Sequence, residues 1–283
     1  MVSVEQYGDY KTSWCPGCGN FPILKALKEA LAGLDLAPHQ VLFVSGIGQA
    51  AKTPHYINGN VFNGLHGRSL PVATGAKLAN PGLVVIVESG DGCMYGEGGN
   101  HFLAAIRRNI DLTVLVHNNQ VYGLTKGQAS PTSAQGFVTR AQPDGVFSSP
   151  FNPIAVAVAL QAGFVARTFA GMGEQLVQVI QEGIRHRGLA IIDILQPCVS
   201  FNHVNTYEWY RKRCKPIDGD HDPTDWAKAM ELSLRWGEEI PVGIIYRNNR
   251  PAFEEQFSVL REAPLLGRKP DMKALGDILQ HYA

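Results

Sequence analysis

Short apolar runs recur along this chain, and each of them ends in a loop rich in glycine or polar residues. The run at 83–88 is typical of a parallel strand covered on both faces, and it leads into Ser89-Gly90-Asp91-Gly92. Alternation of strands and helices at this period predicts an α/β fold with a doubly wound, mostly parallel sheet. Further strands are expected at 41–45, 112–116, 163–169 and 189–195, and helices at 21–32, 99–108 and 174–185.

The chain is expected to form one main domain over residues 1–205, with a cysteine-bearing segment at its N-terminus. Beyond this domain, aromatic, charged and Gly/Asp-rich residues predict an irregular segment at 206–223. An extension then carries a predicted helix at 224–236, a strand at 242–246 and a mostly helical tail. We expect the region 206–283 to pack on the same domain or on a partner chain.

Charge and hydropathy narrow the class of protein. The chain has 25 Lys plus Arg and 25 Asp plus Glu, so it lacks the basic excess of proteins that bind nucleic acid or anionic membranes. Its apolar stretches fall short of the ~18 residues that a membrane span needs. The first residues also lack the basic-then-apolar pattern of a signal peptide. We therefore predict a soluble cytoplasmic enzyme with no nucleic acid and no membrane as partner.

The cysteines do not form a disulfide framework, because there are five of them in a long chain without an export signal. Cys15 and Cys18 lie in a C-x-x-C turn, a spacing that lets two thiolates reach one metal or cluster. Cys198 is the best distant candidate for a third ligand. Two alternatives are a pair of buried, inert cysteines and a redox motif, although no predicted strand precedes the turn.

Asp91 follows one predicted strand and Asn119 follows the next, so their side chains are expected at neighbouring strand ends. A carboxylate and an amide oxygen, a nearby carbonyl and two phosphate oxygens suit Mg²⁺. The glycines that flank Asp91 let a diphosphate approach the backbone amides. The alternative for both residues is an ordinary role in capping or turns.

The segment 46–51 follows a predicted strand and imitates a dinucleotide-binding fingerprint. That fold needs an acidic residue roughly 20 positions further on to hold the ribose. No Asp or Glu lies between Asp35 and Glu88, so NAD binding is rejected.

A dense set of motifs surrounds Asp91 and Asn119 and runs almost continuously from Trp14 to about Val199. They include 46–48 (Gly-Ile-Gly), 52–55 (Lys-Thr-Pro-His), 64–68 (Gly-Leu-His-Gly-Arg), 98–100 (Gly-Gly-Asn), 107–110 (Arg-Arg-Asn-Ile) and 118–128. With these motifs the chain resembles the β subunit of 2-oxoacid:ferredoxin oxidoreductases of the 2-oxoglutarate type. That family binds thiamin diphosphate.

The resemblance implies a site residue by residue. Asp91, the Asn119 side chain and the Val121 carbonyl would hold Mg²⁺, and Lys126, helped by Lys52, would meet a distal substrate carboxylate. The alternatives are a solvated loop lysine at position 126 and a phosphate contact for Lys52. His101, His117 and His186 are expected to be surface or packing residues. The thiamin diphosphate site would be lined by Ile47, Gly48, Gln49, Ala50, His66, Gly90, Gly92, Cys93, Gly123, Leu124 and Thr125.

The resemblance also implies an activity and partners. The family decarboxylates a 2-oxoacid oxidatively to acyl-CoA and CO₂, and electrons pass through an iron–sulfur cluster to ferredoxin. An α subunit would carry the pyrimidine-binding half of the cofactor site, so a heterodimer is expected. Alternatives are pyruvate as the preferred substrate, a non-redox thiamin-diphosphate lyase, and a non-catalytic zinc-binding subunit.

The chain departs from the family at one position of the cluster. Cys15, Cys18 and Cys198 match three of the four expected cysteines, whereas Gln49 stands at the fourth. Clusters are normally held by thiolates. Three outcomes are open: a 4Fe-4S cluster with a non-cysteine ligand, a three-iron cluster, or recruitment of Cys93 or Cys214.

Overall fold

The computed structural model describes residues 1–282, and its centre is one eight-stranded sheet in the order β2-β1-β3-β4-β8-β7-β10-β9. All neighbouring strands in it run parallel except β10 and β7, which are antiparallel. The predicted mostly parallel α/β sheet is therefore confirmed. The strands are β1 (Val41–Ser45), β2 (Asn60–Asn63), β3 (Val84–Gly90), β4 (Thr113–Asn118), β7 (Phe164–Phe169), β8 (Ala190–Leu195), β9 (Cys214–Pro216) and β10 (Ile240–Arg247), and a separate antiparallel pair is β5 (Val121–Tyr122) and β6 (Gln128–Ala129).

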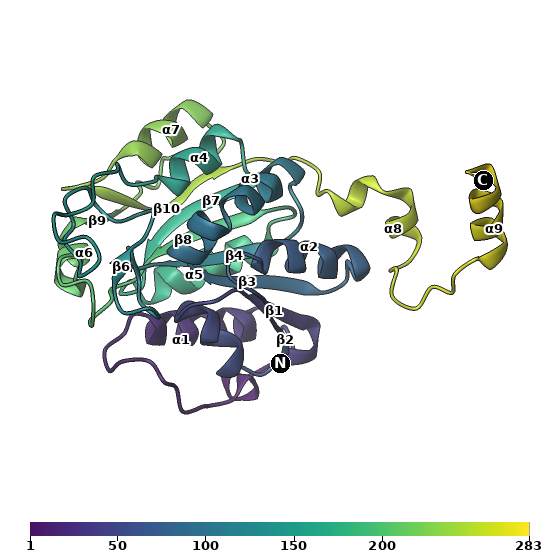
Figure 1. The fold of residues 1–283 in the computed structure, drawn as a ribbon, viewed down its shortest axis with the longest axis horizontal. Coiled ribbons are helices and arrows are strands. Elements are labelled where there is room, and N and C mark those ends of the chain that lie inside the picture. The colour runs from purple at the N-terminus through teal and green to yellow at the C-terminus, as the bar shows by residue number, and fades with distance from the viewer. Residues whose placement is uncertain (283) are drawn as a thin grey trace.

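Helices cover both faces of the sheet (Figure 1). One apolar core lies under α1 (Asn20–Gly33) and α5 (Glu174–Arg185). The other lies under α2 (Ser69–Ala79), α3 (Gly99–Arg108), α4 (Pro153–Ala159) and α7 (Trp226–Leu234). The remaining helical segments are η1 (Val4–Tyr7), η2 (Pro38–Gln40), η3 (Ala50–His55), η4 (Gly92–Glu97), α6 (Tyr207–Arg213), η5 (Glu254–Gln256), α8 (Ser258–Glu262) and α9 (Met272–His281).

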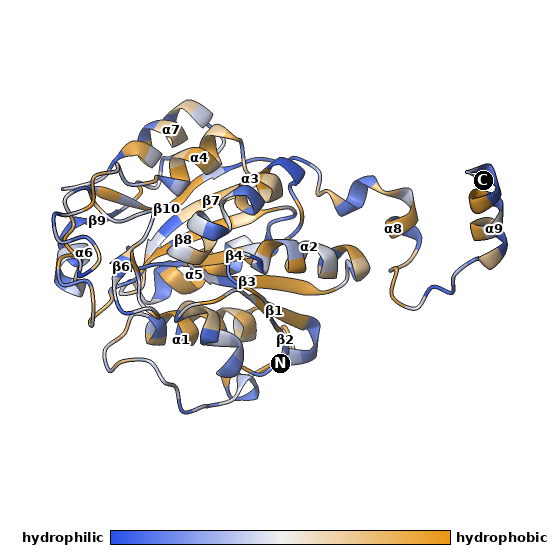
Figure 2. Ribbon diagram, in the orientation of Figure 1, coloured by the Kyte–Doolittle hydropathy of each residue, from blue (hydrophilic) through white to orange (hydrophobic). Residues whose placement is uncertain are grey.

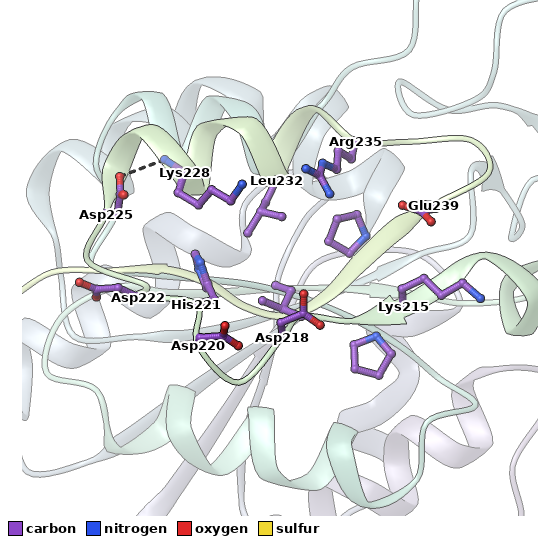
Figure 3. Close-up of a pocket in the computed structure, with 13 residues that line it drawn as sticks. Lys215, Asp218, Asp220, His221, Asp222, Asp225, Lys228, Leu232, Arg235 and Glu239 are labelled. Carbon is purple, nitrogen blue, oxygen red and sulfur yellow. Dashed lines mark hydrogen bonds between the residues drawn. The ribbon is translucent and has the colours of Figure 1, made fainter.

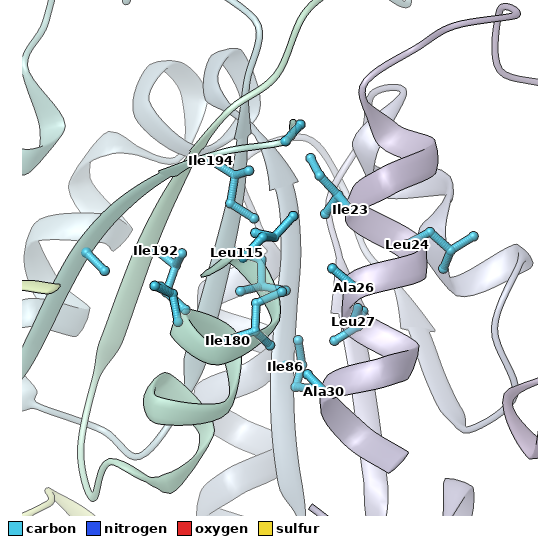
Figure 4. Close-up of a cluster of buried hydrophobic side chains, with 14 of the residues drawn as sticks. Ile23, Leu24, Ala26, Leu27, Ala30, Ile86, Leu115, Ile180, Ile192 and Ile194 are labelled. Carbon is cyan, nitrogen blue, oxygen red and sulfur yellow. The ribbon is translucent and has the colours of Figure 1, made fainter. Parts of the chain in front are cut away.

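The central strands are apolar throughout because successive side chains enter opposite cores. Ile86 of β3 packs toward α1 and α5, whereas Val85 and Val87 pack on the other face. Figure 4 shows Ile86 and Leu115 from the sheet meeting Leu27 of α1. The hydropathy colouring follows this layering, with apolar residues along the sheet (Figure 2).

The structure corrects the sequence-based prediction in three places. The segment 206–223 is only partly irregular, because it contains α6 and β9. Neither β2 nor α2 was predicted: the side chains of β2 are all exposed, and α2 contains Pro71 and Gly75, which disfavour a helix. The boundary at residue 205 stays a prediction, and β9 and β10 beyond it belong to the sheet.

The C-terminal segment with α8 and α9 extends away from the body of the protein (Figure 1). Apolar side chains of α9 are exposed, among them Leu275, Ile278 and Leu279. Within residues 1–282, none of the helices is both long enough and apolar enough to span a bilayer.

We expect Leu27→Ala to lower the free energy of unfolding by about 2–5 kcal/mol, because Leu27 is fully buried between α1 and the sheet. Urea denaturation of the purified protein measures the change. Leu234→Ala is the matched control, since Leu234 is a helical leucine that is 62% exposed, and its effect should stay within about 0.5 kcal/mol. Equal losses in the two variants would contradict this assignment of the core.

Candidate active site

The carboxyl ends of β3 and β4 lie side by side, because Gly90 is in register with His117. Asp91 and Asn119 follow directly. The Asn119 amide N–H donates to Asp91 Oδ1 at 3.4 Å, and the Val121 N–H donates to Asn119 Oδ1 at 3.0 Å. The structure therefore brings the three predicted Mg²⁺ ligands together at one sheet edge.

The Asp91 carboxylate is buried, with 1% of the residue exposed. Its Oδ2 accepts hydrogen bonds from Ser130 Oγ at 2.5 Å and Thr132 Oγ1 at 2.6 Å. Burial raises the pKa of Asp91, and the hydroxyl donors partly oppose that shift. Oδ1 accepts the long contact from the Asn119 N–H, and the Gly92 backbone also hydrogen-bonds to the carboxylate; these backbone contacts leave lone pairs free for a cation. A buried carboxylate with such an oxygen fits Mg²⁺.

The backbone after Asp91 forms the π-helix η4, an element that is often found at functional sites. A Cβ on Gly92 would lie 2.3 Å from the Tyr122 ring, so only glycine lets β5 approach this closely. The Cys93 thiol next to it accepts the amide N–H groups of Ile47 at 3.4 Å and Gly67 at 3.1 Å. Cys93 thus ties together the loops in which Ile47 and His66 lie.

A small cavity brings the three predicted cluster cysteines together with Gln49. The pKa of the Cys18 thiol is raised to about 11, mainly by burial and in smaller part by the neighbouring Cys198 and Cys15. All five cysteines are free thiols. The cavity is lined by Trp14, Cys15, Cys18, Asn20, Gln49, Asn119, Gly123, Gln196, Cys198, Val199, Ser200 and Phe201.

Among residues 1–282, no three His, Cys, Asp or Glu side chains are close enough to hold a single metal ion. This observation disfavours the zinc-binding alternative, because a structural zinc site needs its ligands around one ion. An iron–sulfur cluster contains several irons, so its thiolates need not converge on one point. Three thiols and one amide around one cavity fit such a cluster.

The other predicted site residues lie around residues 119–123, the segment after β4 that carries Asn119 and Val121; we call it the metal loop. The β5–β6 hairpin carries Leu124, Thr125 and Lys126 at an exposed tip, where Lys126 has a φ of +77°. Lys52 Nζ donates to Ser13 Oγ at 3.1 Å, and His66 Nδ1 lies 3.0 Å from Glu97 Oε2. In the segment 46–51, Gly48 has a φ of +134° and open space where a Cβ would be, and Ala50 is buried.

Sequence reasoning missed three polar groups of this region. Ser130 and Thr132 hold Asp91, but hydroxyl residues in a loop carry no periodic signal. His117 was expected at the surface or in packing; it lies in the packed interior, but its two polar contacts were not foreseen. It is buried, with Nε2 2.7 Å from Glu88 Oε2 and Nδ1 2.8 Å from Asn20 Oδ1. Its position at the end of an apolar strand, followed by Asn118-Asn119, was the available signal.

Comparisons with known proteins decide the family. Residues 39–194, more than half of the chain, match the model for the C-terminal TPP-binding domain of thiamine pyrophosphate enzymes, and residues 198–262 match the C-terminal part of the pyruvate ferredoxin oxidoreductase beta subunit. The 2-oxoacid:ferredoxin oxidoreductase subunit beta of Saccharolobus solfataricus is 46% identical over 270 residues, which are 91% of this chain and 88% of that protein. This chain is a β subunit of the 2-oxoacid:ferredoxin oxidoreductase family.

Further relatives of this β subunit agree. The 2-oxoglutarate oxidoreductase subunit KorB of Mycobacterium tuberculosis is 43% identical over 235 residues, which cover 83% of this chain and 60% of that protein. A solved structure of the 2-oxoglutarate:ferredoxin oxidoreductase from Magnetococcus marinus, with 2-oxoglutarate, coenzyme A and succinyl-CoA bound, superposes with a TM-score of 0.91 at 34% identity, covering 98% of this chain and 96% of the other. The predicted family and enzyme class are confirmed.

The β subunit also has a cavity of about 580 Å³ that contains none of the predicted site residues (Figure 3). Charged side chains of both signs line it, including Asp218, Asp222, Asp225 and Lys228. Asp225 caps α7 by accepting the Lys228 N–H, and Asp222 caps the turn at Thr224. Local backbone capping therefore accounts for two of its carboxylates.

A second buried carboxylate supports the site from within the sheet. Asp193 of β8 accepts hydrogen bonds from Tyr95 Oη at 2.9 Å and Asn118 Nδ2 at 3.2 Å, and it is in register with the buried Arg167 of β7. Burial raises the pKa of Asp193 to about 6, which Arg167, Asn118 and Tyr95 oppose. Asn118 Oδ1 in turn accepts from Thr132 Oγ1 at 2.9 Å, so the network reaches the Asp91 carboxylate.

Tyr95→Phe should raise the pKa of Asp193 further, because it removes a hydrogen bond to the charged form. With a native pKa of about 6 against 3.8 when unfolded, the native protein binds the extra proton, so stability falls as pH rises through this window. In Tyr95→Phe the decrease of the unfolding free energy should extend to higher pH. At pH ~8, where Asp193 is charged, this variant should be less stable than wild type by about 1.5–3 kcal/mol. Denaturation between pH 4 and 8 tests this.

Tyr246→Phe is the control for that experiment, since Tyr246 is also buried but its hydroxyl contacts Asn248 and not a carboxylate. Its unfolding free energy should keep the wild-type pH dependence. An identical pH dependence in Tyr95→Phe and the wild-type protein would contradict the assigned role of Tyr95.

Proposed function

We propose that this β subunit supplies the diphosphate-binding half of an enzyme that decarboxylates 2-oxoglutarate oxidatively to succinyl-CoA and CO₂ and passes the electrons to ferredoxin. One observation carries the proposal: Asn119 and Gly123 belong both to the metal loop beside Asp91 and to the wall of the cysteine cavity. A cofactor on the loop and a cluster in the cavity would therefore be neighbours within one chain.

Mg²⁺ would be held by Asp91 Oδ1, the Asn119 side-chain oxygen and the Val121 carbonyl, and would supply positive charge for the diphosphate. Thiamin diphosphate, when bound, supplies the carbanion chemistry that a 2-oxoacid decarboxylation needs. The chain's own contribution is positioning. Ser130 and Thr132 fix the Asp91 carboxylate, and glycine at position 92 lets Tyr122 close over the loop. The cofactor would also be lined by Ile47, Gly48, Gln49, Ala50, His66, Gly90, Cys93, Gly123, Leu124 and Thr125.

Cys15, Cys18 and Cys198 would hold a 4Fe-4S cluster, with Gln49 at the remaining position. The cavity around these four side chains supports this assignment. The free thiols fit a reducing compartment, so we place the enzyme in the cytoplasm. The relatives are named as oxidoreductases, which gives the non-redox lyase alternative no support.

Lys126 and Lys52 are the proposed cationic partners for the distal carboxylate of the substrate. The exposed position of Lys126 next to the metal loop suits contact with a substrate that enters from the partner side. The Mycobacterium relative and the Magnetococcus structure carry 2-oxoglutarate in their names, which favours this substrate over pyruvate.

The partner would be an α subunit with the pyrimidine-binding half of the site, and coenzyme A and ferredoxin would be the co-substrates. Exposed apolar side chains support a protein interface beside the His66 loop: Val61 and Phe62 of the edge strand β2 are each 51% exposed, and Leu65 is 74% exposed. Exposed apolar groups of this kind, next to a binding loop, are typical of an interface.

Asp91→Ala should abolish Mg²⁺-dependent retention of thiamin diphosphate, because Asp91 is the charged member of the three proposed protein ligands. Asp91→Asn should also lose most of the cofactor while keeping the shape of the side chain. Thiamin diphosphate and magnesium per protomer are measured after gel filtration of the αβ complex. Asp218→Ala, an exposed aspartate, is the control. Wild-type cofactor content in both Asp91 variants would refute the site.

Lys126→Ala should lower kcat/KM for 2-oxoglutarate by about 10–100-fold, because a hydrogen bond to a charged carboxylate is worth roughly 1.5–3 kcal/mol. Pyruvate lacks the distal carboxylate, so its turnover should change by less than about threefold. Steady-state assays with a low-potential electron acceptor measure both. Lys25→Ala, an exposed lysine on α1, should leave both substrates unaffected. Equal losses for the two substrates would exclude a role of Lys126 in selectivity.

A further inference from the structure

The Gln49 side chain presents an unsatisfied acceptor in the cysteine cavity. Its Oε1 atom is shielded from solvent and has no hydrogen-bond partner within residues 1–282. Leaving a buried carbonyl oxygen unpaired costs about 1–3 kcal/mol, so such an atom calls for a missing partner. Gln49 lines the same cavity as Cys15, Cys18 and Cys198. A cluster held by these thiolates would supply that partner.

The backbone fixes Gln49 relative to the other candidate ligands. Trp14 Nε1 donates to the Gln49 carbonyl oxygen at 2.8 Å, and Trp14 directly precedes Cys15. On the opposite side, a Cβ built on Gly123 would lie 3.8 Å from Gln49 Cγ and 3.8 Å from Asn119 Nδ2. Gln49 thus lies between the C-x-x-C turn and the metal loop.

The remaining cysteines are engaged elsewhere. Cys93 accepts two backbone amides, from Ile47 and Gly67, and is not part of the cavity wall. Cys214 is buried in β9, at the far edge of the sheet, where burial raises its pKa to about 12. Recruitment of either thiol would require the local fold to open.

The other acceptors named here already have partners in this cavity, whereas the Asn20 Nδ2 donor of the same wall is, like Gln49 Oε1, buried without one among residues 1–282. Asn119 Oδ1 accepts the Val121 N–H, Asn20 Oδ1 meets His117, and Ser200 Oγ donates to Cys15 Sγ at 3.0 Å. Gln196 Nε2 donates to the Pro197 carbonyl and to Cys18 Sγ. In the part of the chain that the structure describes, Gln49 Oε1 is the unpaired acceptor of this wall.

We propose that Gln49 Oε1 is the fourth protein ligand of the cluster, and that the iron it holds is the exchangeable one. The inference rests on the proposed function. A neutral amide oxygen is a harder and weaker ligand for iron than a thiolate. One-electron oxidation by an external oxidant would release that iron as Fe²⁺: [4Fe-4S]²⁺ gives [3Fe-4S]⁺, Fe²⁺ and one electron, which the oxidant takes. Replacing a thiolate by a neutral ligand also makes the site less negative, which favours the reduced cluster.

The experiment compares the wild-type αβ complex with Gln49→Cys and Gln49→Leu, all purified anaerobically. Each is treated with ferricyanide and a chelator, and iron, sulfide and the EPR spectrum are followed. The wild-type complex should lose one of four irons and show a three-iron signal. After removal of the oxidant and the chelator, ⁵⁷Fe²⁺ added with dithionite, which supplies the one electron required, should refill one site in the Mössbauer spectrum. Gln49→Cys should keep all four irons and have a lower reduction potential. Gln49→Leu should lose the iron at least about tenfold faster than wild type.

The controls separate this inference from the proposed function. Three irons and thiamin diphosphate retained in Gln49→Leu show that the variant is folded. Equal rates of iron loss in wild type and Gln49→Leu would overturn the role of Gln49. So would a wild-type cluster that keeps all four irons under ferricyanide, as the cluster of Gln49→Cys should. No iron or sulfide in any of the three complexes would instead overturn the iron–sulfur part of the proposed function.

Discussion

The parallel pairing of β3 with β4 is the constraint on which the site depends. It places Gly90 beside His117, and the chain leaves both strands at the same edge with Asp91 and Asn119 in hydrogen-bond contact. The register itself is held by apolar side chains that enter both cores, so a shift of one residue would reverse which of them faces each helix layer. The apolar packing that stabilises the sheet therefore also sets the geometry of the metal loop.

The position of the cysteine cavity also follows from the carboxyl ends of these strands. α1 begins at Asn20, directly after the C-x-x-C turn, and its buried face packs on the sheet, so the turn is delivered to the carboxyl end of the strands. Cys198 arrives from the end of β8, the neighbour of β4. Packing of one helix on one sheet thus brings the two thiols of the C-x-x-C turn to the sequence-distant Cys198, close to Asn119.

The pairing of Asp91 with Asn119 could be predicted from the sequence, because ends of neighbouring parallel strands must meet. The sequence offered Cys198 as the best distant candidate for a third ligand, but its convergence with Cys15 could not be derived from spacing, since it depends on how α1 packs; the resemblance to a family supported the choice. Ser130 and Thr132 were missed because a loop hydroxyl has no pattern that marks it. β2 was missed for a related reason: all its side chains are exposed, so its sequence lacks the apolar alternation of a half-buried strand.

Three buried carboxylates lie near this sheet edge, and they differ in how their charge is balanced. Glu88 contacts the ring of His117, and Asp193 lies beside the buried Arg167, so each has a basic group of the chain close by. Asp91 has only neutral donors among its hydrogen-bond partners in the described chain: two hydroxyls and backbone amides. Burying a carboxylate without a counter-charge is costly, so its charge has to be balanced by a proton or by a cation from outside. The hydroxyls of Ser130 and Thr132 hydrogen-bond to the ionised form and so oppose the proton. The arrangement therefore favours a metal cation at Asp91, whereas the other two carboxylates need none.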